Sequence, residues 1–262
     1  CVANNITISL DGLTKRFDSF TAVNNISFSL GKGEVLGFLG PNGAGKSTTM
    51  KMLTGYLPIT QGRASICGYD VVSSPLSAQE RIGYLPEGAP LYGDMSSIEF
   101  LRFVAEVRGF RGAERNEKVK NAVSKLELGS VINKPIETLS KGFKRRVGFA
   151  QAILHDPDVL ILDEPTDGLD PNQKHQVRSL IKEMAPDKAI VISTHLLEEV
   201  SAVCSRAIII SNGNLVFDGT PKDFAKLGPL DEAFRELTSE KPIKKRSNKK
   251  RSIKTRPKKD NR

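Results

Sequence analysis

VLGFLGPNGAGKST, residues 35–48, is the stretch of the 262-residue sequence that decides the fold. An apolar run at 35–40 leads into a segment that matches the phosphate-loop pattern G-x-x-x-x-G-K-[ST]. The run predicts a buried strand, and residues 46–53 predict a helix. A glycine-rich turn between them directs backbone N–H groups and the positive end of the helix at phosphate oxygens. The stretch predicts a nucleotide site formed by Gly40, Pro41, Asn42, Gly43, Ala44, Gly45, Lys46, Ser47 and Thr48.

Within this loop, two side chains have distinct expected tasks. Lys46 is expected to reach the β- and γ-phosphates, and Ser47 is expected to hold Mg²⁺. A second element, which is acidic, supports this assignment: the apolar run at 159–162 ends in Asp163-Glu164. Carboxylates at the carboxyl end of a buried parallel strand lie beside the phosphate loop of a neighbouring strand. Asp163 is therefore expected in the metal shell and Glu164 beside the attacking water, although acids are also common where strands turn into loops.

The rest of the chain predicts an α/β fold around these two elements. Strands are expected at 6–10, 26–30, 35–40, 159–163 and 189–194, helices at 46–53, 142–154, 175–185 and 195–204, and a hairpin at 207–217. Alternating strands and helices indicate a core with a mainly parallel sheet, and together with the phosphate loop they predict a P-loop NTPase core. An N-terminal antiparallel β region precedes this core, and an α-helical subdomain is inserted at about 94–155. The expected domain spans 5–230, and a C-terminal helix and a basic tail occupy 231–262.

Charge is unevenly distributed along the sequence. Residues 241–262 contain twelve Lys or Arg and one Asp, a net charge of +11. Subtracting it from the +9 of the whole chain leaves −2 for residues 1–240. Such a tail is expected to be disordered in isolation. It is either a solvated extension, a contact for anionic lipid, or, in third place, a contact for nucleic acid.

Several classes of protein are disfavoured by composition. No apolar run approaches the roughly 18 residues of a membrane helix, and the first residues do not read as a secretory signal. The three cysteines are widely spaced and form no Cys-x-x-Cys pair, so neither a disulfide framework nor a zinc site is expected.

The segment between the phosphate loop and the acidic strand narrows the class further. Leu139-Ser140-Lys141-Gly142-Phe143, followed by KRRVGFAQAIL and DPDVLILDEPTDGLD, resembles the signature region of ATP-binding-cassette (ABC) ATPases. The family pattern is LSGGQ, of which Ser140 and Gly142 are kept while Lys141 and Phe143 depart. The chain is most similar to cassettes of multidrug, sodium or gliding-motility exporters. Ser140 alone would also be an ordinary helix N-cap.

Other family motifs follow in the expected order. The segment ending in Asp170 resembles the D-loop, and His195 resembles the switch histidine. Phe17 occupies about the position at which the family stacks an aromatic ring on adenine. Glu87 stands where the Q-loop has glutamine, which puts a full charge near Mg²⁺. Outside this context, His195 would be interpreted as a helix cap and Phe17 as core packing.

The resemblance implies a function and a set of roles. Two cassettes would dimerise head to tail around ATP and Mg²⁺ and drive a separate integral membrane permease, with export favoured. Glu164, His195 and Lys46 would be catalytic, and Ser47, Asp163 and Glu87 would face the metal. Ser140, Gly142 and Asp170 would act across the interface, the partner being a second copy or a homologous cassette.

The expected location is cytoplasmic and peripheral, on the inner face of the cell membrane. A soluble ABC ATPase acting on RNA, ribosomes or DNA is the alternative, and nucleic acid is the less favoured partner. The transported substrate is not encoded in this chain, because specificity would reside in the membrane subunit.

Overall fold

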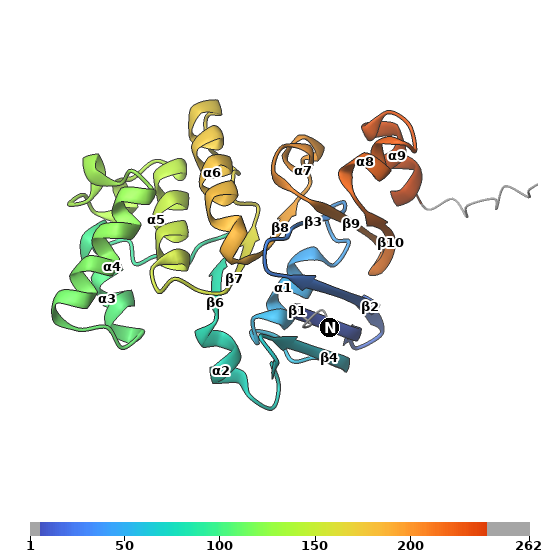
Figure 1. The fold of residues 1–262 in the computed structure, drawn as a ribbon, viewed down its shortest axis with the longest axis horizontal. Helices are drawn as coiled ribbons and strands as arrows, with labels where there is room; N and C mark the ends of the chain where they lie inside the picture. The colour runs from blue at the N-terminus through green and yellow to red at the C-terminus, as the bar shows by residue number, and fades with distance from the viewer. Residues whose placement is uncertain (1–5, 240–262) are drawn as a thin grey trace, which may run out of the picture.

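The centre of the molecule is a six-stranded sheet in the order β10-β9-β3-β8-β7-β6 (Figure 1), seen in a computed structural model that describes residues 6–239. Five neighbouring strands are parallel, and β10 pairs with β9 in the antiparallel sense. The strands are β3 (Val35–Leu39), β6 (Ile82–Leu85), β7 (Val159–Asp163), β8 (Ala189–Thr194), β9 (Arg206–Ser211) and β10 (Asn214–Gly219). Strands β3, β7 and β8 are buried throughout, as expected for central parallel strands covered on both faces.

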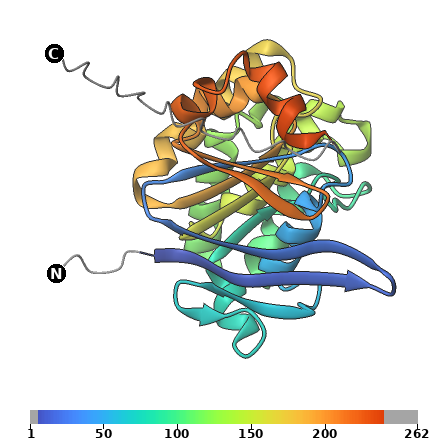
Figure 2. The same cartoon turned by 90° about the vertical axis from the view of Figure 1, so that its right-hand side faces the viewer.

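A second sheet lies beside the first and is antiparallel, in the order β2-β1-β4-β5 (Figure 2). Its strands are β1 (Ile6–Phe17), β2 (Phe20–Gly31), β4 (Gln61–Ile66) and β5 (Tyr69–Asp70). Helix α1 (Lys46–Leu53) packs between the two sheets, with Met50, Met52 and Leu53 fully buried. One face of the large sheet contributes Leu36 and Phe38 to this core.

The opposite face of the large sheet supports a helical subdomain. Alternate residues such as Leu160 and Leu162 pack there with Phe149 of α5 and Phe100 of α3. The subdomain contains α3 (Ser97–Val107), α4 (Gly112–Lys125), α5 (Lys141–Ile153) and the short 3-10 turns η1 (Gly129–Val131) and η2 (Ile136–Thr138). It extends to one side of the sheet (Figure 1).

Helices also cover the remaining parts of the sheet. They are α2 (Pro75–Glu80), α6 (Pro171–Met184), η3 (Ala185–Asp187), α7 (Leu197–Val203), α8 (Pro221–Ala225) and α9 (Leu230–Thr238). Phe224 of α8 and Ala233 of α9 pack against Leu39 and Ile209, at the end of the molecule away from α3 and α4 (Figure 1).

The topology decides where function can reside. Strands β3, β8 and β7 are consecutive neighbours in the parallel part of the sheet. Their carboxyl ends are followed by the phosphate loop, by His195 and by Glu164, respectively. The phosphate loop therefore meets, at one edge, two residues that follow it by more than a hundred positions in the sequence.

The predicted fold class is confirmed, and some boundaries are corrected. The first two strands are longer than expected, and α7 begins at Leu197 rather than at His195. Elements β4, β5, α2 and β6 were not predicted. Residues 240–262, which include the predicted tail, lie outside the described residues. None of the helices formed within residues 6–239 combines the length and the apolar character that a bilayer-spanning segment needs.

The buried His155, between α5 and β7, is expected to make the stability of the fold sensitive to acid. Burial, with a smaller contribution from Arg108, lowers its pKa from about 6.5 to about 4, although its Nε2 contacts the carbonyl oxygen of Ile82 at 3.1 Å. The folded chain keeps this ring neutral where the unfolded chain binds a proton. Stability is therefore retained above pH 6.5 and falls, by up to about 3 kcal/mol, as the pH drops towards 4.

Urea unfolding of wild type and His155→Gln across this pH range tests the assignment. The glutamine amide can still donate to the Ile82 carbonyl but does not titrate. The variant is expected to lose less stability than wild type between pH 6.5 and pH 4. Parallel curves for the two proteins would contradict the role assigned to His155.

Candidate nucleotide site

A cavity of ≈ 440 Å³ opens at the carboxyl edge of the large sheet. Its walls come from the turn between β1 and β2, the phosphate loop and α1, the segment after β6, and the end of β7. The lining residues are Phe17, Phe20, Ala22, Asn42, Gly43, Gly45, Lys46, Ser47, Thr48, Glu87, Asp163 and Glu164. Most residues predicted to contact nucleotide or metal are thus brought together.

Glycines are required in the phosphate loop by the backbone itself. Gly43 and Gly45 have φ of 80° and 108°, in the left-handed region that other residues rarely adopt. A Cβ on Gly45 would lie 2.4 Å from the carbonyl oxygen of Ala22, and one on Gly40 would lie 2.5 Å from that of Ile210. The loop is consequently packed against β2 and β9, leaving its cavity side free for a ligand.

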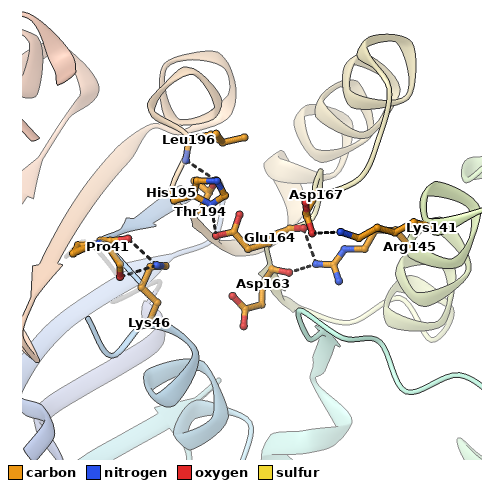
Figure 3. A network of polar contacts seen from close by, with 11 residues as sticks. Pro41, Lys46, Lys141, Arg145, Asp163, Glu164, Asp167, Thr194, His195 and Leu196 are labelled. Carbon is orange, nitrogen blue, oxygen red and sulfur yellow. Dashed lines mark hydrogen bonds and ion pairs between the residues drawn. The ribbon is translucent and has the colours of Figure 1, made fainter. Parts of the chain in front are cut away.

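Lys46 is a buried cation whose hydrogen-bond partners within residues 6–239 are main-chain carbonyls. Its side chain is 8% exposed, and Nζ donates to the carbonyl oxygens of Gly40 at 2.7 Å and Pro41 at 3.2 Å (Figure 3). Burial lowers the pKa of Lys46, while the nearby carboxylates of Glu164, Asp163 and Glu87 oppose the shift. The loop therefore holds an ammonium group whose partners are weaker than phosphate oxygens would be.

Asp163 and Glu164 leave the end of β7 in different directions. Asp163 is 2% exposed, and its carboxylate points away from α5, on the side of Lys46 (Figure 3). Glu164 adopts a left-handed φ of 53°, and its N–H donates to the carbonyl oxygen of Ser193 at 2.8 Å. A non-glycine residue held in this region stores strain, which native structures keep mainly where geometry matters.

His195 contacts the predicted base directly. Its Nδ1 lies 3.0 Å from Oε1 of Glu164. The two residues were predicted separately, Glu164 from the end of the apolar run at 159–162 and His195 from the segment after the strand at 189–194. The histidine is not a helix cap, because Leu196 precedes α7 as its N-cap residue. Thr194 fixes the turn by accepting a hydrogen bond at Oγ1 from the N–H of Leu196. A carboxylate paired with a half-exposed histidine is a suitable group for orienting water.

The donor set is consistent with Mg²⁺ and a phosphorylated ligand. The hydroxyl of Ser47 and the carboxylates of Asp163 and Glu87 line the same cavity, and oxygen donors are those that Mg²⁺ prefers. Among residues 6–239, no cluster of three or more His, Cys, Asp or Glu could hold a metal without such a ligand. Mg²⁺ is commonly held by one or two carboxylates together with substrate phosphates, and Asp163 and Glu87 provide two carboxylates at this cavity.

Two aromatic rings form the outer wall of the cavity. Phe17 and Phe20 pair across the hairpin turn and are 43% and 61% exposed, so neither is a core residue. The Lys15 ammonium lies 4.9 Å from the centre of the Phe17 ring. Exposed rings beside a phosphate loop provide a stacking surface for a base, and Phe20 was missed by sequence reasoning.

Ser140, Gly142 and Asp170 do not line this cavity. Ser140 is the N-cap of α5 and accepts from the N–H of Phe143 at 3.3 Å, and Asp170 is the N-cap of α6. A Cβ on Gly142 would lie 2.6 Å from Oε1 of Gln173, so the starts of the two helices are packed together. Ser140 and Asp170 are both exposed and lie outside the lining of the nucleotide cavity.

Lys141, which departs from the family pattern, has a partner within the chain. Its Nζ bonds Oδ2 of Asp167 at 2.8 Å, and this hydrogen bond is the main cause of the lowered pKa of Asp167. Comparable contacts were missed elsewhere: Arg145, in the same helix, reaches four backbone carbonyls around the site. Only the packing of α5 against β6 and β7 reveals them.

Known proteins resemble the chain along most of its length. A sequence model of the family described as ABC transporter matches residues 23–167. The uncharacterized ABC transporter ATP-binding protein YhcH of Bacillus subtilis is 37% identical over 82% of this chain and 70% of its own. The linearmycin resistance ATP-binding protein LnrL of the same organism is 35% identical over 84% and 72%. The probable multidrug ABC transporter ATP-binding protein YbhF of Escherichia coli is 37% identical, but the chain spans only 38% of its length.

Solved structures agree with these relatives. One described as the ATP-binding subunit of an ABC transporter has a TM-score of 0.81 and 30% identity, covering 89% of this chain and all of its own. The dimeric structure of a bacterial ABC transporter cassette, MJ0796, has a TM-score of 0.76 over 82% of this chain and 98% of its own. At 23% identity, the second shows the shared fold alone. The chain therefore belongs to the ABC transporter family, as an ATP-binding cassette of its transport ATPases.

Proposed function

We propose that the chain hydrolyses ATP to drive a separate membrane permease by ATP-dependent dimerisation with a second cassette. The observation that carries this proposal is that Ser140 does not line the cavity that holds the phosphate loop. The chain has a phosphate cavity with a Glu164–His195 pair, and Ser140 is exposed outside that cavity. In the proposed dimer, these two groups of residues would be the two halves of a composite site.

Within one chain, the residues have separable tasks. Lys46 would exchange the carbonyls of Gly40 and Pro41 for phosphate oxygens and balance the charge that develops during phosphoryl transfer. Glu164, oriented by His195, would orient the attacking water. Mg²⁺, held by Ser47 and Asp163 with Glu87 nearby, would supply charge neutralisation when bound. Phe17 and Phe20 would contact the base.

Across the interface, Ser140 and the start of α5 would complete the site of the other chain. The Ser140 hydroxyl is exposed and the dipole of a 13-residue helix adds positive potential at that end. ATP held between two such surfaces would contact both chains only in the closed dimer, so binding would shift the population towards closure.

A groove beside Glu87 is the proposed docking place for the permease. It has a volume of ≈ 480 Å³ and is lined mainly by apolar surface, including Tyr56, Tyr84, Pro86 and Pro90. Glu87, Ser47 and Asp163 line both this groove and the nucleotide cavity. A partner seated there would therefore contact the metal-facing segment.

Export is proposed as the direction, with the cassette on the cytoplasmic face of the cell membrane. It is supported by the names of relatives, among them a Nod factor export ATP-binding protein of Burkholderia lata, 38% identical over 82% of this chain and 71% of its own. The net charge of +11 on residues 241–262 supports a further contact of this segment with anionic lipid. The relatives do not favour the RNA, ribosome or DNA alternative.

Purification in detergent after expression in the source cells tests the proposal. A polytopic membrane protein is expected to copurify with the tagged chain, and vanadate-sensitive ATP turnover is expected in the complex. Salt-sensitive RNA binding that disappears on deletion of 241–262, with no membrane partner, would instead support the alternative.

A further inference from the structure

Arg145 is a buried cation whose hydrogen bonds converge on the main chain around the site. The residue is 6% exposed, and Nη1 donates to the carbonyl oxygens of Pro86 at 2.6 Å and Glu87 at 2.7 Å. Nη2 donates to the carbonyl oxygens of Asp163 and, at 2.7 Å, Glu164 (Figure 3). One guanidinium thus joins the segments that follow β6 and β7, two neighbouring strands of the parallel sheet.

These contacts are made to the backbone rather than to carboxylates. The Glu164 side chain remains directed at His195, and the Asp163 carboxylate points away from α5 (Figure 3). Arg145 therefore holds the main chain of Asp163 and Glu164 in place and leaves their carboxylates without a direct ion pair to its guanidinium. The planar fork is suited to this task, because its donors have a fixed relative geometry that a lysine lacks.

Charge keeps the guanidinium in place despite its burial. Burial lowers the pKa of Arg145, whereas Asp163, Asp167, Glu164 and Glu87 raise it, in that order. Glu87 is the acidic replacement in the Q-loop position, and its own carbonyl is one of the four acceptors. The extra negative charge there lies beside a fixed positive charge.

Helix α5 connects these contacts to the surface. Arg145 follows the N-cap Ser140 by five residues, which places the two roughly 140° apart around the helix. Ser140 is exposed and Arg145 faces the sheet. A displacement of α5 would therefore move the Glu87 and Glu164 segments together.

We propose that Arg145 is a positioning residue for ATP hydrolysis. Its hydrogen bonds hold the segment at Pro86 and Glu87 against the segment at Asp163 and Glu164, so that Glu87 and Glu164 are positioned together for the reaction. Its effect on turnover rests on the proposed role of Glu164. Its effect on backbone order does not, and this separates the two claims experimentally.

Arg146 provides a matched control. It is also 6% exposed and lies in the same helix, but its guanidinium contacts the carboxylate of Glu127 at 3.4 Å and lies over the ring of Phe143. The test compares Arg145→Lys and Arg145→Met with Arg146→Lys and Arg146→Met in the full chain. Thermal unfolding, steady-state ATP turnover and amide exchange of segments 85–91 and 163–168 are measured for each.

Arg145→Met is expected to lower kcat about 10²-fold and to change KM less than about 3-fold, the result of misplacing groups rather than removing ligand contacts. Arg145→Lys should retain part of the activity. The Asp167 N–H donates to the Glu164 carbonyl oxygen at 3.1 Å. Its hydrogen exchange should accelerate about tenfold or more in both Arg145 variants. The Arg146 variants should keep kcat within about 2-fold of wild type, even where their melting temperature falls as much as that of the Arg145 variants.

Equal losses of kcat in the two series, or unchanged exchange in Arg145→Met, would overturn the proposal. Combining Arg145→Met with Glu164→Gln should lower turnover little beyond Glu164→Gln alone, because both act through one group. If Glu164→Gln itself keeps full turnover, the assignment of the base fails, while the exchange result still tests Arg145.

Discussion

Glu164→Gln is expected to lower ATP turnover about 10²- to 10⁴-fold while ATP binding changes little, because the amide is nearly isosteric but cannot accept a proton or polarise water. The glutamine can still contact His195 Nδ1, which lies 3.0 Å from the present carboxylate. The left-handed backbone at this position is set by Ser193 and Arg145, not by the Glu164 carboxylate. The substitution should therefore change the chemistry without changing the fold.

Single-turnover hydrolysis and equilibrium binding of a fluorescent ATP analogue measure the two quantities separately. Glu232→Gln, an exposed residue in the first turn of α9, is the matched control for removal of a carboxylate. It should behave as wild type in both assays. Full turnover in Glu164→Gln would show that another group positions the water.

The same variant also reports on the composite site. A chain that binds ATP but does not hydrolyse it should accumulate as a dimer, since ATP would contact the Ser140 surface of a second chain. Light scattering with and without ATP and Mg²⁺ measures the mass. A Glu164→Gln chain that stays monomeric at saturating nucleotide, even with its membrane partner, would contradict the proposed dimer.

Features encoded locally could be predicted from the sequence. The phosphate loop combines an apolar strand, a glycine-rich turn and a helix start within fourteen residues, so the local sequence was enough to identify it. Likewise, VLILD has no polar residue before Asp163, which indicates a central parallel strand and places the acids at its carboxyl end. The α/β class followed from these two segments and from AIVIST at β8.

Features created by tertiary contact could not be predicted in this way. Segment 61–85 contains the short strands β4 and β6, whose partners β1 and β7 are far away in sequence, and β5, which pairs only with β4 among the described strands. Phe20 was missed because its exposure depends on the two-residue turn that pairs it with Phe17. Arg145 lies in a run of basic residues, and only the packing of α5 separates its buried contacts from those of Lys144.

Lys46→Ala is expected to weaken ATP binding about 10- to 100-fold, the loss of roughly 1.5 to 3 kcal/mol that a charged hydrogen bond contributes. In the described part of the chain, Lys46 donates hydrogen bonds to the carbonyls of Gly40 and Pro41 alone, so its removal should change stability less than affinity. Lys51→Ala, in the same helix but outside the nucleotide cavity, is the control for loss of a positive charge.

Binding by calorimetry, with urea unfolding of the same preparations, separates affinity from stability. Lys46→Met adds a second comparison, because methionine fills much of the same space without a charge. If both Lys46 variants lose affinity equally and Lys51→Ala does not, the ammonium rather than packing accounts for binding. Undiminished affinity in both variants would contradict the phosphate-loop assignment, because that assignment makes the Lys46 ammonium a direct contact of the phosphates.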